Sequence, residues 1–96
     1  MRRGEVWLYK GLRERDVLIV QADAAAPNAS TVMAIPLVDL GTVIETMTTI
    51  RVGRWIADAT RIGEFRRASL AEQVGVIGTH ELDQLGAALK MALGLD

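Results

Sequence analysis

The segment 16–21, with the sequence DVLIVQ, constrains the fold more than any other part of this chain of 96 residues. Charged residues precede it, its apolar part is Val17–Val20, and Gln21 and Asp23 end the run. A strand with one face in solvent alternates apolar and polar residues, whereas a continuous apolar run is typical of a strand covered on both faces. The run therefore predicts a strand that lies between two packed layers.

Further strand candidates surround this run, and turn residues separate them. The segment 42–52, TVIETMTTIRV, is rich in β-branched residues, which favours strand. Pro36 removes a backbone donor from the segment 31–38, so we expect a bulge or a sheet edge there. Residues 22–30 break the pattern, and the segment 54–62 fits a strand or a short helix. The remaining strand candidates are residues 4–9 and 72–77, with a turn at 10–14.

The last part of the chain predicts one amphipathic helix. Thr79 is a suitable N-cap, and Gly94 is a suitable C-terminal stop. One apolar stripe runs between them and consists of Leu82, Leu85, Leu89, Ala92 and Leu93. Several antiparallel strands followed by a helix predict a single α+β domain over residues 1–96, barrel-like, with the helix packed on the sheet.

Composition excludes several kinds of site. The chain has no cysteine and one histidine, His80, so disulfides, cysteine metal sites and histidine-dependent catalysis are not expected. We expect no metal and no cofactor. Charged residues interrupt every apolar run, and no apolar core follows the first charges, so we expect neither a membrane span nor a signal peptide, and a cytoplasmic location.

The basic residues leave metal-independent chemistry open. Nine of the eleven are arginine, which suits bidentate recognition of phosphate or carboxylate. Arg15 and Asp16 lie at the N-terminal end of the predicted buried strand. They can mark the solvated end of that strand, or Arg15 can stabilise charge on a phosphate while Asp16 holds its guanidinium or acts as a base. The residues alone leave both interpretations open.

Four motifs in order resemble the MazF/PemK/Kid toxins of bacterial type II toxin–antitoxin pairs: MRRGEVW, RDVLIVQAD, TVMAIPL and the tail ELDQLGAALKMALGL. The resemblance implies a small SH3-like, partly open β-barrel of mainly antiparallel strands, usually a homodimer. It also implies metal-independent, sequence-specific cleavage of single-stranded RNA, leaving a 2′,3′-cyclic phosphate and a 5′-hydroxyl. The catalytic arginine of the family matches Arg15, and a cognate antitoxin normally blocks the groove.

The chain departs from the family pattern at defined positions. Asp16 replaces a proline, and Val38 occupies the position of the catalytic threonine. The family's acidic position falls on Thr60 by ungapped count, with Asp58 two residues earlier. The loop at 10–14 is short. The residues that we expect to contact RNA are Arg13, Thr42, Arg51 and Arg54. Trp55 suits either stacking on a base or a half-buried core position.

Two alternatives remain at this stage. The related CcdB toxins poison DNA gyrase by binding it, and the short first loop and the intact sequence IPL resemble that branch. Their C-terminal Trp-Gly-Ile is Leu93-Gly94-Leu95 here, so a large aromatic anchor is missing. The other alternative is a catalytically degenerate relative that only binds an antitoxin or a host protein.

Overall fold

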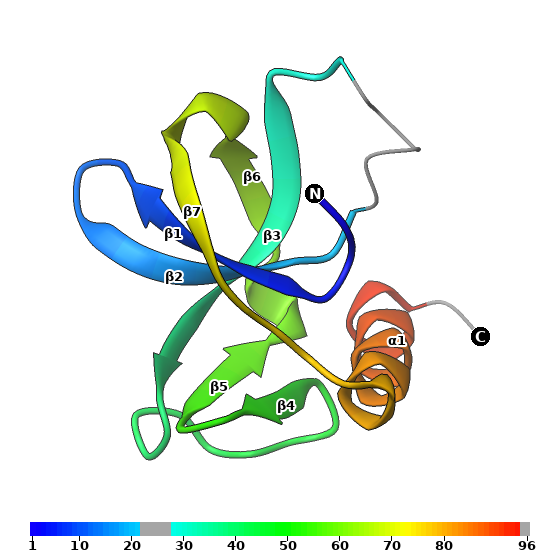
Figure 1. Cartoon of the computed structure of the whole chain (residues 1–96). Helices are drawn as coiled ribbons and strands as arrows, with labels where there is room; N and C mark the ends of the chain where they lie inside the picture. Colours follow the sequence, from blue (N-terminus) through cyan, green and yellow to red (C-terminus); the bar gives the residue numbers. More distant parts are fainter. Residues whose placement is uncertain (22–27, 95–96) are drawn as a thin grey trace.

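The computed structural model describes residues 1–21 and 28–94. A seven-stranded sheet, in which every strand pair is antiparallel, is followed by one helix (Figure 1). The elements are β1 (Glu5–Lys10), β2 (Glu14–Ile19), β3 (Thr31–Asp39), β4 (Thr49–Val52), β5 (Trp55–Asp58), η2 (Ala59–Arg61), β6 (Gly63–Arg66), η3 (Arg67–Ser69), β7 (Leu70–Val76) and α1 (Thr79–Leu93).

The strand order is β4-β5-β3-β2-β1-β7, with β6 paired to the N-terminal part of β3. No pairing joins β4 to β7 among the described strands, so the sheet curls without closing. The helix packs at the β4 end and contacts η2 (Figure 1). The predicted class, a partly open antiparallel barrel with a C-terminal helix, is confirmed.

The continuous apolar run is covered on both faces, as predicted. Leu18 and Val20 face the core beneath α1, where Leu85 is fully buried. Val17 and Ile19 face the opposite side and pack in a second cluster with Val32, Ala34 and Leu70. Successive side chains of a strand point to opposite faces, so β2 forms part of both cores.

The expectation of a bulge or an edge at Pro36 is wrong. Pro36 lies inside the central strand β3, opposite Val17, in unbroken register with β2. Backbone groups of Met33 face β2, since Val20 N donates to Met33 O at 3.1 Å. Alternation therefore turns the position of Pro36 toward the other side, where β3 ends its pairing with β6 at Ala34 and begins with β5 at Leu37. The backbone nitrogen of Pro36, which has no hydrogen to donate, therefore faces the gap between β6 and β5, where no strand pairs with it.

The helix begins one residue earlier than predicted, because Gly78 and not Thr79 is the N-cap. The side chain of Glu81 returns to this cap, and its Oε1 accepts a hydrogen bond from Gly78 N at 3.0 Å. Gly94 ends the helix with φ of 71°, as predicted. In the apolar stripe, Leu85 and Leu89 are buried, Leu82 and Ala92 are partly buried, and Leu93 is 55% exposed.

Three segments differ from the sequence-based expectation or extend it. Residues 43–48 form no strand, and only Thr49–Val52 of the predicted segment does. The ambiguous segment 54–62 contains both β5 and the short helix η2. The last strand begins at Leu70, two residues before the prediction. Most of the predicted break at 22–30 lies outside the described residues.

Candidate active site

The sheet opens between β2 and β3 at the end where the charged residues stand. These strands pair only over residues 17–19 of β2, while the first residues of β2 pair with β1 alone. Beyond Pro36, β3 pairs with β5 instead. A cleft of about 480 Å³ lies at this opening. Its lining consists of Arg13, Glu14, Arg15, Leu37, Val38, Asp39, Thr42 and Trp55.

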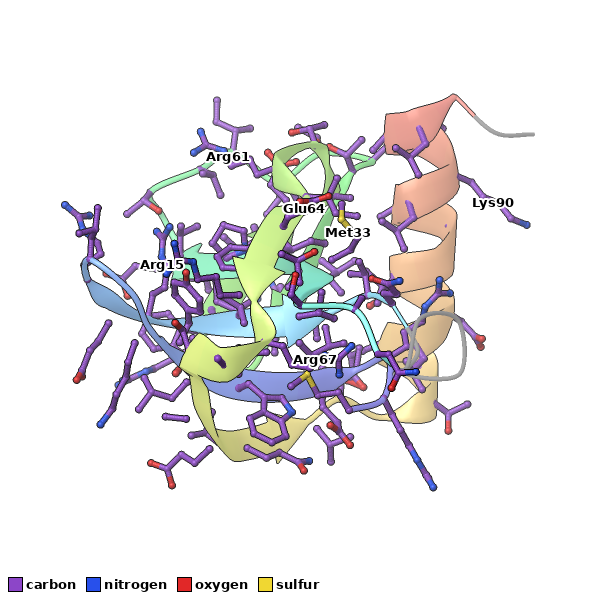
Figure 2. The ribbon with its side chains drawn as sticks, turned by 90° about the horizontal axis from the view of Figure 1, so that it is seen from above. Arg15, Met33, Arg61, Glu64, Arg67 and Lys90 are labelled. Atoms are coloured by element: carbon purple, nitrogen blue, oxygen red, sulfur yellow. The ribbon has the colours of Figure 1, made fainter. Side chains whose placement is uncertain are left out.

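Arg15 is held in this cleft on the face of the smaller core. It lies directly across from Tyr9 of β1, and the ring of Tyr9 meets Phe65 edge-on at 5.0 Å. Figure 2 shows Arg15 at the end of the molecule away from α1. Its Nε is the single buried side-chain nitrogen or oxygen among residues 1–21 and 28–94 that has no hydrogen-bond partner. A buried donor without an acceptor is costly, so it marks a position that an anion would satisfy.

Val38 and Thr42 share the cleft with Arg15. The register that sets Val17 against Pro36 brings Val38 to the level of Arg15 on the same face. The position that matches the family's threonine therefore does lie beside the arginine, but it carries no hydroxyl. Thr42 supplies a hydroxyl at the cleft, and its Oγ1 donates to Asp39 O at 2.7 Å.

The other predicted arginines are distributed unevenly. Arg13 lines the cleft, is exposed, and forms no side-chain hydrogen bond or ion pair with the part of the chain that the structure describes. Arg51 does not reach the cleft. It forms a bidentate ion pair with Glu45, with Nε–Oε1 at 2.7 Å, and this hydrogen bond lowers the pKa of Glu45. Arg54 stacks on Trp55, its guanidinium carbon 4.7 Å from the ring centroid.

Asp16 is not brought together with Arg15. The two are neighbours in β2, so their side chains leave opposite faces of the strand. Asp16 lines a separate pocket of about 240 Å³, together with Val6, Val52, Gly53, Trp55, Val74, Gly75 and Val76. No contact supports the expectation that Asp16 holds the guanidinium of Arg15, and this geometry does not favour it as the base in the cleft.

Asp58, near the family's acidic position, has a structural role. Its Oδ1 accepts hydrogen bonds from the Thr60 amide at 3.0 Å and from the Thr60 hydroxyl at 2.7 Å, which caps η2. Thr48 donates to the same oxygen at 3.3 Å. Partial burial raises the pKa of Asp58, but these hydrogen bonds together lower it below its ordinary value. Neither Asp58 nor Thr60 lines the cleft.

Sequence reasoning assigned Trp55 to either a core position or a base platform, and the structure gives it both environments. Its side chain packs against the larger core, and it borders both the Arg15 cleft and the Asp16 pocket. The sequence singled out neither Glu14 nor Asp39 as a site residue, and both line the cleft. The signal that could have found Asp39 is its place beside Val38 at the end of an apolar strand.

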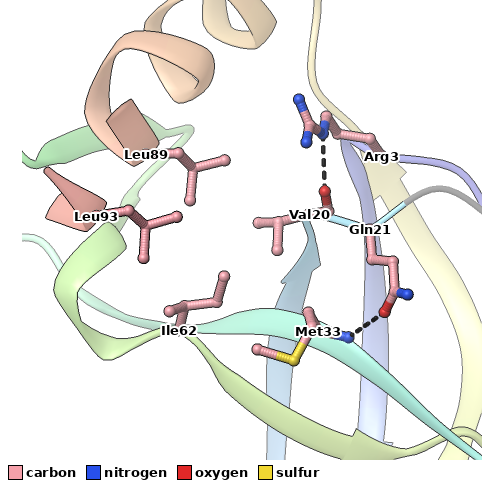
Figure 3. A pocket seen from close by; sticks show the side chains of 7 residues that line it. All are labelled: Arg3, Val20, Gln21, Met33, Ile62, Leu89 and Leu93. Atoms are coloured by element: carbon pink, nitrogen blue, oxygen red, sulfur yellow. Dashed lines mark hydrogen bonds between the residues drawn. The ribbon is translucent and has the colours of Figure 1, made fainter. Parts of the chain in front are cut away.

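A second and larger pocket lies elsewhere. It measures about 650 Å³ and lies between α1, β3 and the N-terminal segment (Figure 3). Its walls are mainly aliphatic, with Leu89 and Leu93 from the helix. The Arg3 Nε at its rim is already engaged, donating to Val20 O at 2.7 Å. We place the candidate active site at the smaller cleft because the unsatisfied donor is there.

The described residues lack two further features, a metal-binding cluster and a membrane-spanning helix. They contain no group of three or more histidine, cysteine or acidic side chains arranged to hold a metal ion. They also contain no helix of the length and apolar character that a membrane span requires.

Solved structures match this chain over its whole length. An endoribonuclease of a Mycobacterial species, in complex with its cognate antitoxin, has a TM-score of 0.88 at 24% identity, covering 100% of this chain and 97% of that one. A MazE–MazF complex of Deinococcus radiodurans has a TM-score of 0.84 at 15% identity, with coverages of 99% and 97%. The Mycobacterium tuberculosis toxin MazF-mt6 has a TM-score of 0.81 at 18% identity, with coverages of 96% and 98%.

No family model and no curated protein sequence matches the chain. At the identities above, the structural likeness establishes the fold and not the activity. The chain has the fold of MazF-type toxins, as the four sequence motifs predicted.

Proposed function

We propose that this protein is the toxin of a type II toxin–antitoxin pair and acts in the cytoplasm as a metal-independent endoribonuclease on single-stranded RNA. The observation that carries the proposal is the buried, unpartnered Nε of Arg15 in an open cleft. Solved structures of the same fold that are named endoribonucleases support it.

The reaction needs charge stabilisation at one phosphate. The 2′-oxygen attacks the adjacent phosphorus, the bond to the 5′-oxygen breaks, and this oxygen takes up a proton from water, so the products are a 2′,3′-cyclic phosphate and a 5′-hydroxyl. In the transition state, negative charge builds up on the phosphoryl oxygens. The guanidinium of Arg15 offers several N–H donors in a fixed fork, which suits that charge, and its partly buried position strengthens the interaction.

The proton of the 2′-hydroxyl must go to a base. Val38 has no group that could accept it, and Asp16 does not line the cleft. The acidic residues that line the cleft are Glu14 and Asp39, so we assign the base role to one of these two. Changing each to its amide separately identifies which, because only the catalytic carboxylate will lower the cleavage rate by about 10²-fold or more.

The decisive experiment compares the wild type with Arg15→Ala. Each purified protein is incubated with a long single-stranded RNA in EDTA, and the 5′ ends of the products are mapped. We expect discrete cuts with 5′-hydroxyl ends from the wild type, and a rate lower by about 10²–10³-fold for the variant. Circular dichroism should show both proteins folded.

Lys90→Ala is the matched control, because it also removes one positive charge. Lys90 lies on α1 and points away from the sheet (Figure 2). This variant should cleave like the wild type. An intact RNA after incubation with wild-type protein would overturn the proposal and favour a degenerate relative that only binds.

We further propose a cognate antitoxin and a second copy of the chain as partners. Structures of this fold in complex with an antitoxin support the first. Exposed apolar side chains outside the Arg15 cleft and the Asp16 pocket support the second, since Leu12 and Ile44 are 111% and 85% exposed. Light scattering of the purified protein tests for a dimer. The gyrase alternative depends on the chain end, where residues 95–96 lie outside the described part, and no observation favours it.

A further inference from the structure

We infer that the pocket at Asp16 binds one base of the RNA, and that Asp16 selects a base carrying an amino group. The inference rests on the proposed function, because it names the substrate feature that the same protein would recognise. It gives Asp16 a role different from the one that its position after Arg15 suggested.

The pocket has the shape and chemistry for a flat ring. Its volume of about 240 Å³ is below the roughly 300–1,000 Å³ of pockets that hold drug-sized ligands. Its walls are the aromatic Trp55 and several valines, and its one charged group is the Asp16 carboxylate. Apolar walls with a single polar group on one side suit a base, whose faces are apolar and whose edge is polar.

Asp16 is available to a ligand. It is half-buried, and its carboxylate forms no hydrogen bond or ion pair with any residue in the ranges 1–21 and 28–94. An ionised carboxylate only accepts hydrogen bonds. Cytosine, adenine and guanine offer an exocyclic amino donor on their pairing edge, whereas uracil offers one ring N–H between two carbonyl acceptors. The carboxylate therefore favours the three amino bases over uracil.

The pocket lies next to the Arg15 cleft, because Trp55 lines both. A phosphate on Arg15 and a base beside Asp16 would thus lie on the two sides of one residue. Arg54 stacks on the Trp55 ring at 4.7 Å and helps to fix the ring in place. Gly53 carries no side chain at the rim, and a Cβ there would meet no atom within 4 Å, so the pocket entrance is open.

The test measures binding separately from cleavage. Wild-type protein, Asp16→Asn and Asp83→Asn are titrated with the 5′-monophosphates of cytidine, adenosine, guanosine and uridine, and amide NMR spectra are recorded. Asp83 lies on the exposed side of α1, so its variant is a charge-matched control. We expect the Trp55 indole N–H and the Asp16 amide to shift with the amino bases at affinities about tenfold above that for uridine monophosphate. Asp16→Asn should reduce this ratio to about one, and Asp83→Asn should keep it.

Mapping of cleavage sites with the same three proteins gives the second readout. We expect Asp16→Asn to lose the preference against uracil at one position beside the cut, and Asp83→Asn to keep both the wild-type rate and this preference. Loss of all cleavage would make Asp16 catalytic and overturn the inference. The inference would also be overturned by an unchanged base preference of the variant or by absent shifts at Trp55. A changed oligomeric mass of Asp16→Asn would overturn it as well, because it would assign the pocket to an interface between copies of the chain. If the wild type cleaves no RNA, the proposed function is wrong, and the titration would still show whether the pocket prefers bases with an amino group.

Discussion

Two groups of charged residues lie at different ends of this small sheet, and their environments differ. At the open end of β2, the side chains of Arg13 and Asp16 form no hydrogen bond or ion pair with the described residues, and Arg15 Nε is buried without an acceptor. At the β4–β5 end, Arg51 is bound to Glu45 and Asp58 accepts three hydrogen bonds. The second group is satisfied by the protein itself.

The difference separates structural from functional charges. Natural proteins satisfy their buried polar groups, and the exceptions concentrate at functional sites. Both groups look alike in sequence, as arginines and carboxylates near strand ends. Only the three-dimensional pairing shows that one group stabilises the fold while the other is available to a ligand. Changes at the open end of β2 should therefore affect activity more than stability, and changes at the β4–β5 end should affect stability more than activity.

The largest expected effect comes from completing the open end. Val38→Thr would place a hydroxyl in the cleft beside Arg15, where the family pattern has one. We expect the RNA cleavage rate to rise by roughly tenfold, because a positioned proton donor or acceptor contributes at least that much. The rate is measured with excess enzyme on one mapped cleavage site.

Val43→Thr is the control for this change, since Val43 is also half-buried but does not line the cleft. Its cleavage rate should equal that of the wild type. An unchanged rate for Val38→Thr would mean that a hydroxyl at this position has no catalytic use in this chain.

A smaller and opposite pair of effects concerns stability. Asp58→Ala removes the cap of η2 and should lower the free energy of unfolding by about 1 kcal/mol, with cleavage unchanged. Asp16→Asn removes a half-buried charge that has no partner among the described residues, so it should leave stability unchanged or slightly raised. Urea denaturation of both variants measures the difference. A loss of stability in Asp16→Asn comparable to that in Asp58→Ala would show that Asp16 is also a structural charge.

Much of the fold could be predicted from the sequence because the strongest patterns are local. The apolar run of β2 and the stripe of α1 depend on periodicity, and both were confirmed. The strand prediction for the segment 42–52 was wrong beyond residues 49–52, because several of its β-branched residues are threonines, which carry hydroxyls. Thr49 Oγ1 accepts from Thr46 N at 2.8 Å, and Thr46 Oγ1 accepts from Thr48 N at 3.2 Å. Such side chain to backbone hydrogen bonds compete with strand pairing.

The candidate site was predictable in part. The family resemblance pointed to Arg15, and the structure places it beside Val38 in a cleft. Alternation along a strand could have separated Arg15 from Asp16, since neighbours in a strand face opposite sides. The pairing of Arg51 with Glu45 could not be foreseen, because it depends on the path of the loop that carries Glu45. Trp55 joins two pockets only through the tertiary arrangement of β5.

The smallest expected effect is a pH dependence at the satisfied end. The pKa of Asp58 in the folded protein lies below the ordinary value of 3.8. A carboxyl with a lowered folded-state pKa contributes stability that is fully present above its unfolded-state pKa and is lost as the pH falls through the folded-state value. The stability difference between wild type and Asp58→Asn should therefore be constant from pH 7 to about pH 5 and shrink below pH 3.8. Urea denaturation at each pH measures this difference. Asp83→Asn controls for net charge, and the same decline in that variant would assign the effect to overall charge instead of the hydrogen bonds on Asp58.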